Sequence, residues 1–279
     1  MYPLLISLLF AGACSYASYV NELGPGTVSG YGIAAFLLSM FLTGSIVRRK
    51  VSGVQEELQA IMTRGQNRIN RKVQQFQSRP GGNPTQIQRE LEAEQKNMIT
   101  QALEFLPKLE PFKKWNLLMA RQIDTMRLQF LYQLRDMEAV DRLLARRSPF
   151  SGPLFSEPIL VGMKMARQYE NKEFAAAEKS FKKHIKWFRK DRGSLLYALM
   201  AWIYVKNGQN DEARKLLLKG KEVTGNSVLA RNWEQLANDN PKKFSNAGLG
   251  EEWFGLYLEK PPAPKQKRMR GNPRGHAMF

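Results

Sequence analysis

The sequence predicts an all-α membrane protein: an N-terminal transmembrane helical hairpin, then amphipathic juxtamembrane helices, then a helical solenoid. Two observations carry this prediction. No charged residue occurs between Leu23 and Val47, whereas the chain turns abruptly basic at Arg48. Beyond that junction, apolar residues recur at steps of three and four along successive segments, as in helices with one buried face. We therefore divide the chain into segments 1–47, 48–111, 112–258 and 259–279.

Two apolar stretches form the predicted hairpin. Pro3 to Val20 is just long enough to cross a bilayer core of about 30 Å at about 1.5 Å per residue, and Thr27 to Val47 is the stronger candidate. The short turn between them places Pro25 between two glycines, which forces the two helices to run antiparallel. The alternative for residues 1–18 is a cleaved signal peptide, although no Lys or Arg precedes its apolar core.

Small side chains recur at helical spacing on both arms of the hairpin. In a bilayer, such residues let two helices approach each other closely. We therefore expect the two arms to pack through these faces, or the faces to meet other membrane spans. The residues are Ser7, Ala11, Cys14, Ser15 and Ser18 on the first arm, and Gly32, Ala35, Ser39 and Thr43 on the second.

Charge predicts how the protein sits in the membrane. All 43 Lys and Arg residues lie at or beyond Arg48, and the formal net charge of the chain is +18. Arg48, Arg49 and Lys50 should keep the exit of the second span on the cytoplasmic side, because basic flanks are retained there. We therefore expect an integral membrane protein whose soluble part faces the cytoplasm. This charge attracts anionic lipids, nucleic acid or acidic proteins without choosing among them.

Segment 48–111 is predicted to contain two amphipathic helices. The first continues the second span or bends just after it, carries apolar residues from Val51 to Phe76, and is interrupted at Gly65. Proline and glycine in residues 78–84 end this helix, and Thr85 to Leu106 forms the next one. A coiled-coil stalk and packing against the same chain remain alternatives for the first helix.

Three short elements of segment 112–258 share a turn, an acidic residue, an alanine and an apolar helix face. Their alanines are Ala139, Ala177 and Ala213, and an apolar helix precedes each element. This period resembles the tetratricopeptide repeat, whose unit of about 34 residues pairs two helices. The resemblance implies a superhelix of helix pairs; an irregular helical bundle is the alternative.

The resemblance differs in strength among the copies. The best copy runs from Ser194 to Gly225, with Tyr197 and Gly220 where that family has large and small residues. The other stretches are Pro158 to Asp191, Leu117 to Arg147, and Leu229 to Leu236 as the first helix of an incomplete fourth unit.

The resemblance also implies a concave groove, lined by the first helix of each repeat, in which the family binds peptides. In the best copy, the lining residues would be Leu195, Ala198, Trp202 and Val205. Because all four are apolar, we expect the groove to take an apolar helix or another part of this chain rather than a charged peptide end.

One such part of the chain is the aromatic segment Leu249 to Leu258. Its residues Trp253, Phe254 and Tyr257 require burial because of their large apolar area. The segment either caps the repeat domain, as terminal units of repeat arrays require, or serves as an exposed docking peptide.

A basic stripe lies on the helix predicted from Phe174 to Lys190, opposite an apolar stripe. Such a stripe is either a solvated face or a contact for lipid or nucleic acid. The tail, residues 259–279, is basic and rich in proline, so we expect disorder and charge-driven contacts with RNA, ribosomes or anionic membranes. The residues of the stripe are Lys179, Lys182, Lys183, Lys186 and Lys190.

Motifs for catalysis are not found in the sequence. It contains no P-loop, no histidine pair at metal-binding spacing and no nucleophile with a plausible base. We therefore expect neither an enzyme nor a bound cofactor. The function predicted first is a membrane-anchored scaffold that binds protein partners, which the sequence does not identify, on the cytoplasmic side. The alternatives are an accessory subunit of a larger membrane complex, or a membrane-linked contact with RNA, ribosomes or anionic lipid.

Overall fold

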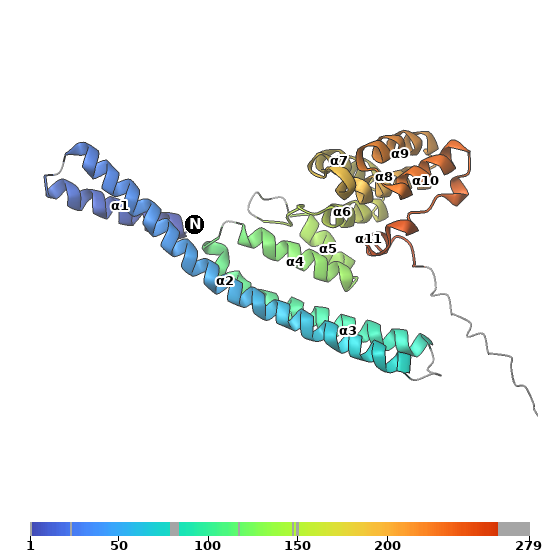
Figure 1. The fold of residues 1–279 in the computed structure, drawn as a ribbon, viewed down its shortest axis with the longest axis horizontal. Helices are drawn as coiled ribbons and strands as arrows, with labels where there is room; N and C mark the ends of the chain where they lie inside the picture. The colour runs from blue at the N-terminus through green and yellow to red at the C-terminus, as the bar shows by residue number, and fades with distance from the viewer. Residues whose placement is uncertain are drawn as a thin grey trace, which may run out of the picture. The chain divides into compact units, whose positions relative to one another are not determined.

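The computed structural model describes residues 2–22, 24–78, 84–116, 118–146, 148 and 151–261. Within these ranges every regular element is a helix, apart from a single bridge between Ser148 and Ser151, which confirms the predicted all-α class. The chain forms two compact units, residues 1–171 and 172–279, and this boundary falls inside the predicted segment 112–258. Each unit is described separately (Figure 1). Residues 262–279 of the predicted tail lie outside the described residues.

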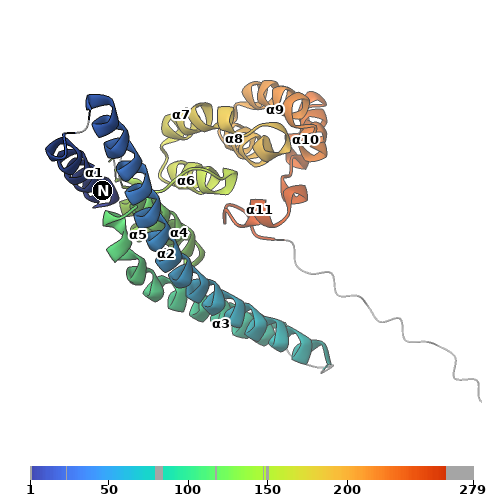
Figure 2. The ribbon, with the colours of Figure 1, turned by 60° about the vertical axis from the view of Figure 1, so that its left-hand side comes forward.

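The first unit begins with the predicted hairpin. Helix α1 (Tyr2–Val20) and the first part of helix α2 (Pro25–Ser78) lie side by side in both ribbon views (Figures 1 and 2). Both helices are long and apolar enough to cross a membrane. Ser7 and Ser39 are buried between them with their hydroxyl oxygens 3.4 Å apart, and a Cβ at Gly32 would clash with a Ser15 hydroxyl. The two arms pack through small residues, as predicted.

Helix α2 is one uninterrupted helix of 54 residues, so the second span continues into the juxtamembrane segment. Helix α3 (Pro84–Phe105) runs back along its second half (Figure 1). The long apolar face of α2 is therefore covered by the same chain, which is the second of the two sequence alternatives. The core between these helices contains Val51 and Leu58 from α2 and Met98, Ile99, Ala102 and Phe105 from α3.

Gly65, predicted as an interruption of the apolar face, is a packing contact in the structure. It is buried, and a Cβ built there would lie 2.7 Å from Met98 Cβ and closer still to Met98 Sδ. The missing side chain thus makes room for a methionine of α3, which explains why glycine interrupts the apolar pattern at this position.

The rest of the first unit extends the same core. A 3₁₀ helix, η1, contributes Leu106 and Leu109, and the next helix contributes Met119 and Ile123. The elements are η1 (Leu106–Lys114), α4 (Met119–Gln133), α5 (Met137–Leu144) and α6 (Pro158–Glu170).

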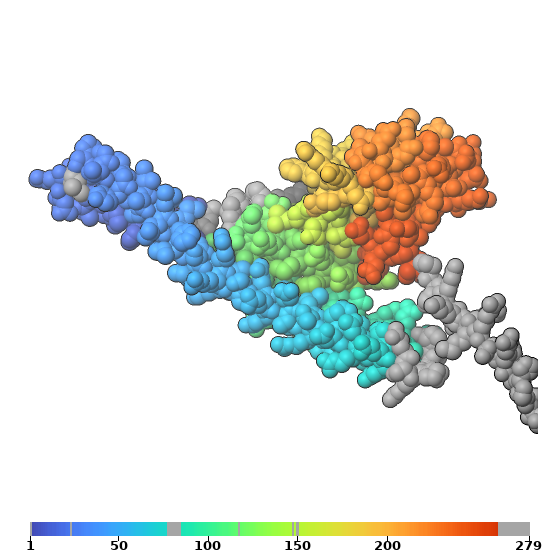
Figure 3. Space-filling model, viewed as in Figure 1, coloured from blue at the N-terminus to red at the C-terminus, as the bar shows by residue number. Residues whose placement is uncertain are grey.

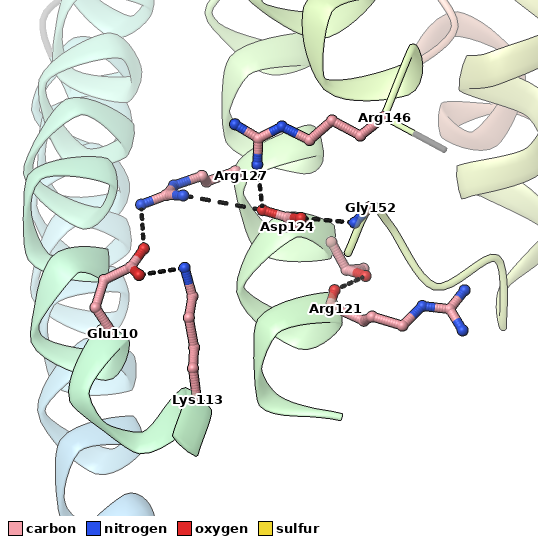
Figure 4. Close-up of polar contacts among 8 residues, drawn as sticks. Glu110, Lys113, Arg121, Asp124, Arg127, Arg146 and Gly152 are labelled. Carbon is pink, nitrogen blue, oxygen red and sulfur yellow. Dashed lines mark hydrogen bonds and ion pairs between the residues drawn. The ribbon is translucent and has the colours of Figure 1, made fainter. Parts of the chain in front are cut away.

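A buried carboxylate ties α4 to the segment after α5. Asp124 is 2% exposed, and its oxygens accept hydrogen bonds from the Gly152 backbone nitrogen at 2.8 Å and from Arg146 Nη1 at 3.3 Å (Figure 4). Arg127 lies between Asp124 and Glu110, with its Nη2 2.7 Å from Glu110 Oε1. Because all these partners hold backbone or neighbouring helices in place, we interpret the network as structural.

A second ion pair joins α5 to α6. Arg167 donates to both carboxylate oxygens of Asp141, with distances of 3.0 Å from Nε and 2.6 Å from Nη2. The hydrogen bond from Arg167 lowers the pKa of Asp141 in spite of partial burial, and the same pairing raises the pKa of Arg167. This bidentate geometry fixes both the angle and the distance between α5 and α6.

The second unit is built around one buried helix, α8 (Ser194–Lys206), whose residues 194–203 are all buried. Helix α9 (Asn210–Thr224) packs along it, and Gly220 lets the Tyr197 ring approach to 3.0 Å from where a Cβ would be. Tyr197 and Gly220, the large and the small residue singled out in the stretch from Ser194 to Gly225, are therefore in contact. The other elements are α7 (Phe174–His184), η2 (Ile185–Trp187), η3 (Lys190–Gly193), α10 (Ser227–Ala237), η4 (Pro241–Lys243), η5 (Ala247–Leu249) and α11 (Glu251–Phe254).

The turns of the three repeat elements share one backbone geometry. A residue with positive φ precedes the N-cap in each, namely Arg135 (58°), Lys172 (62°) and Gly208 (75°). Four residues after the N-cap stand Val140, Ala177 and Ala213, which are all fully buried, whereas Ala139 is not. The register predicted from the alanines is therefore wrong by one residue in the first element.

Replacement of Gly65 by alanine should destabilise the protein, because the new methyl group overlaps Met98. Overpacking of this kind costs about 1–3 kcal/mol. Gly53→Ala is the matched control, since nothing lies within 4 Å of a Cβ at that position of the same helix. We expect a lower midpoint of thermal unfolding only for Gly65→Ala, measured by circular dichroism of the full chain in detergent. Equal midpoints for the two variants would contradict the described packing of α3 on α2.

Candidate functional site

The groove predicted on the best repeat is not open. Leu195, Ala198 and Trp202 are 1%, 0% and 5% exposed, and Val205 is partly buried. The segment that follows α10 contacts two of these residues within the same unit, as described below. The candidate groove is thus occupied by the chain itself.

One carboxylate joins this segment to α8. Glu259 accepts a hydrogen bond from the Trp202 indole at 2.7 Å through Oε1, and one from the Trp253 indole at 2.8 Å through Oε2. The two indole rings meet edge to face, with centroids 5.7 Å apart and planes at 67°. This geometry is favourable for aromatic pairs, and both indole N–H groups are satisfied by one charged acceptor. We call Trp202, Trp253 and Glu259 the tryptophan clasp.

Two buried asparagines extend the contact beyond the clasp. Asn246 donates to the Ala198 carbonyl oxygen at 3.0 Å and accepts from Asn232 Nδ2 at 2.8 Å. Asn232 also accepts from the Ser245 backbone nitrogen at 3.1 Å, and both asparagines are 0% exposed. Because buried amides that are fully paired fix their neighbours, the segment is held at two places along α8.

The aromatic segment therefore takes its predicted role as a cap. Trp253 is 0% exposed, while Phe254 and Tyr257 are partly buried. Figure 3 shows this segment, in red, lying against the orange helices of its own unit. The alternative of an exposed docking peptide does not describe this structure. Glu259, Asn232 and Asn246 were missed by sequence reasoning; the one available signal was that Glu259 is the last acidic residue of the chain.

The predicted basic surface is present, but not on one helix. All five lysines are exposed, yet α7 ends at His184, so Lys186 lies in η2 and Lys190 begins η3. The prediction of a single helix from Phe174 to Lys190 is therefore wrong beyond His184. Phe188 explains the break, because it takes an extended conformation and is only 3% exposed. Lys182 pairs with Glu178 at 2.5 Å, and this hydrogen bond lowers the pKa of Glu178.

The residues predicted to set orientation lie inside α2. Arg48, Arg49 and Lys50 are exposed on successive positions just after the apolar part of the helix. The Tyr2 ring, at the start of α1, meets the Trp115 ring edge to face with centroids 5.3 Å apart. A tyrosine and a tryptophan thus meet beside the start of the apolar hairpin.

The histidines and carboxylates form no metal site in the described part of the chain. No group of three or more His, Cys, Asp or Glu side chains there could hold a metal ion. His184 is buried, and its Nδ1 lies 2.8 Å from the Ser180 carbonyl oxygen of the preceding turn. The other histidine, His276, lies outside the described residues.

Comparisons of this chain with protein-family models, with curated proteins and with solved structures each found no match.

Replacement of Glu259 by glutamine should weaken the tryptophan clasp. Glutamine keeps one acceptor oxygen, so one of the two indole donors loses its partner, at a cost of about 1–3 kcal/mol. We expect a lower unfolding midpoint, a changed tryptophan emission and faster proteolysis near residue 250 of the full chain. Glu252→Gln, an exposed change in the same segment, is the matched control. If both variants behaved alike, Glu259 would not hold the cap.

Proposed function

We propose that this chain is a membrane-anchored helical scaffold that binds protein partners on the cytoplasmic side of a membrane, without enzymatic activity. The observation that carries the proposal is the continuity of α2. One helix of 54 residues includes the second apolar span and the stalk covered by α3. Any domain attached to the second half of α2 would be held at the bilayer by a continuous helix instead of a flexible linker.

The mechanism of such a scaffold is localisation. A tethered binding surface raises the effective concentration of its partner near the membrane, with no new contact required. The helix pairs of residues 112–258 support this role, and we infer that their likeness to tetratricopeptide repeats extends to the way the pairs stack. Because α8 is covered by the tryptophan clasp, partners would bind the exposed faces of the helices instead of the predicted groove.

A role as an accessory subunit of a larger membrane complex is the second candidate. The packing of the hairpin argues against the small-residue faces as the interface with other subunits. The predicted interface for other spans was the small-residue face of each arm. Ser7, Gly32 and Ser39 of these faces are already buried between α1 and α2. Large apolar residues such as Leu9 and Phe41, 76% and 73% exposed, point away from the hairpin and suit lipid tails.

The proposed orientation predicts which parts of the chain face the cytoplasm. With Cys14 replaced by serine, single cysteines would be introduced at Thr27, the first residue of the second span, and at Gln55, beyond its end; both positions are exposed. In intact cells, a membrane-impermeant maleimide should label Thr27→Cys. It should label Gln55→Cys only after permeabilisation, because basic residues from Arg48 onward hold that side in the cytoplasm. The reverse pattern would contradict the proposed orientation.

The scaffold proposal predicts a protein partner whose binding does not depend on charge alone. We would purify the tagged full chain from native membranes in mild detergent and wash portions with nuclease and with high salt. A protein retained in stoichiometric amount after both washes is the expected result, with membranes from untagged cells as the control. Partners lost with nuclease or salt would place the function in the basic surface, and the absence of any partner would contradict a scaffold.

A further inference from the structure

Trp187 is the most exposed large hydrophobic side chain in the described part of the protein. Its exposed fraction is 77%, just above that of Leu9 (76%), the most exposed large hydrophobic residue of the apolar hairpin. A fully buried tryptophan would remove 150–250 Å² of surface from water, so its display to solvent is costly for the isolated chain. A single exposed hydrophobic residue is common on protein surfaces; Trp187 is distinguished by the anchored turn that presents it and by the basic residues around it.

The backbone around Trp187 is held in place. In η2 the Phe188 backbone nitrogen donates to the Ile185 carbonyl oxygen at 3.1 Å, and the Phe188 ring is buried. Gly193 packs tightly below this turn, because a Cβ there would lie 3.1 Å from the Phe188 carbonyl oxygen and 3.3 Å from Ile185 Cδ1. The turn is thus anchored on both sides of the indole, which it presents outward.

Exposed basic residues surround this turn in the sequence, and no acidic residue lies between 179 and 190. Two carboxylates flank this stretch. Glu178 pairs with Lys182, and Asp191 accepts from the Ser194 hydroxyl at 2.8 Å and from Asn226 Nδ2 at 3.0 Å. Residues 178–191 thus carry six Lys or Arg residues against two carboxylates, which leaves a net positive charge. We call the following residues the Trp187 surface: Lys179, Lys183, Lys186, Trp187, Arg189 and Lys190.

We propose that the Trp187 surface binds the headgroup region of an anionic lipid bilayer. Lysine and arginine near such a surface contribute about 1 kcal/mol each, and tryptophan favours the headgroup level, where its ring and its N–H group are both accommodated. The two apolar helices of the same chain give the surface ready access to a membrane. This contact concerns lipid, so it goes beyond the scaffold role and needs no protein partner.

Nucleic acid is the competing ligand for a basic surface. Proteins that bind single strands stack successive bases on several aromatic side chains. Between residues 179 and 190, Trp187 is the one exposed aromatic residue, because Phe181 and Phe188 are 7% and 3% exposed. One indole among lysines suits a bilayer surface better than a stacking platform.

The test uses the full chain reconstituted in nanodiscs of neutral lipid. Vesicles of phosphatidylcholine, alone or with about 30% phosphatidylglycerol, would carry brominated acyl chains that quench nearby tryptophan. In a second arm, the nanodisc itself would contain the anionic and brominated lipids. Binding would be measured by co-flotation, and the contact of Trp187 by the difference in quenching between the natural chain and Trp187→Phe.

The charge requirement is tested with matched triple variants. Lys183→Glu, Lys186→Glu and Lys190→Glu change the Trp187 surface, whereas the control changes Lys219, Lys242 and Lys243 to glutamate. These control lysines are exposed in the same unit and outside the surface. Loss of three contacts of about 1 kcal/mol each corresponds to at least about 100-fold weaker vesicle binding.

We expect quenching specific to Trp187 in at least one arm, only with anionic lipid, lost in about 0.5 M salt and lost in the surface variant but not in the control. The proposal is overturned if neither arm shows such quenching, or if neutral and anionic lipids quench equally. Tight binding of poly-U RNA that depends on the three lysines, without lipid quenching, would assign the surface to nucleic acid instead. None of these outcomes depends on whether a protein partner is found.

Discussion

The continuity of α2 is the constraint on which the first unit depends. One helix carries a stretch apolar enough to cross a membrane in its first part and an apolar face covered by α3 in its second part. Each half is covered by a helix that runs back along it, and each crossing is made close by a glycine. Gly32 makes room for Ser15 of α1, and Gly65 makes room for Met98 of α3. The apolar hairpin of α1 and α2 and the pairing of α2 with α3 thus depend on the same kind of close contact at a glycine.

The second unit solves a different problem, because α8 is apolar all round and must be covered on every side. Helix α9 covers part of it through the contact of Gly220 with Tyr197. The segment after α10 covers another part, and the tryptophan clasp fastens it with a charged acceptor between two indoles. The surface that the sequence predicted as a peptide-binding groove is therefore part of the core of this unit.

The charged residues of this chain fall into two groups, those in ion pairs between elements and those exposed at the surface. Some carboxylates pair with arginine between neighbouring elements, as Asp141 does with Arg167 and Glu110 with Arg127. Such pairs position helices, and the chain still has 43 Lys and Arg residues against 25 Asp and Glu. Beside Trp187, exposed basic residues lie next to an exposed aromatic ring on an anchored turn. The proposed lipid contact would add this specific surface to the general electrostatic attraction of a basic protein.

Sequence alone determined the elements that depend on local signals. The two apolar helices, the end of α2 at Ser78, the start of α3 at Pro84 and the turns before α5, α7 and α9 follow from hydropathy, proline and glycine, whose effects act within a few residues. Only the tertiary structure decided what those elements meet. Trp202 and Glu259 are 57 positions apart, the gap at Gly65 has meaning only beside Met98, and α7 ends at His184 because Phe188 is buried in an extended conformation. Contacts between distant residues depend on packing, which periodicity does not encode.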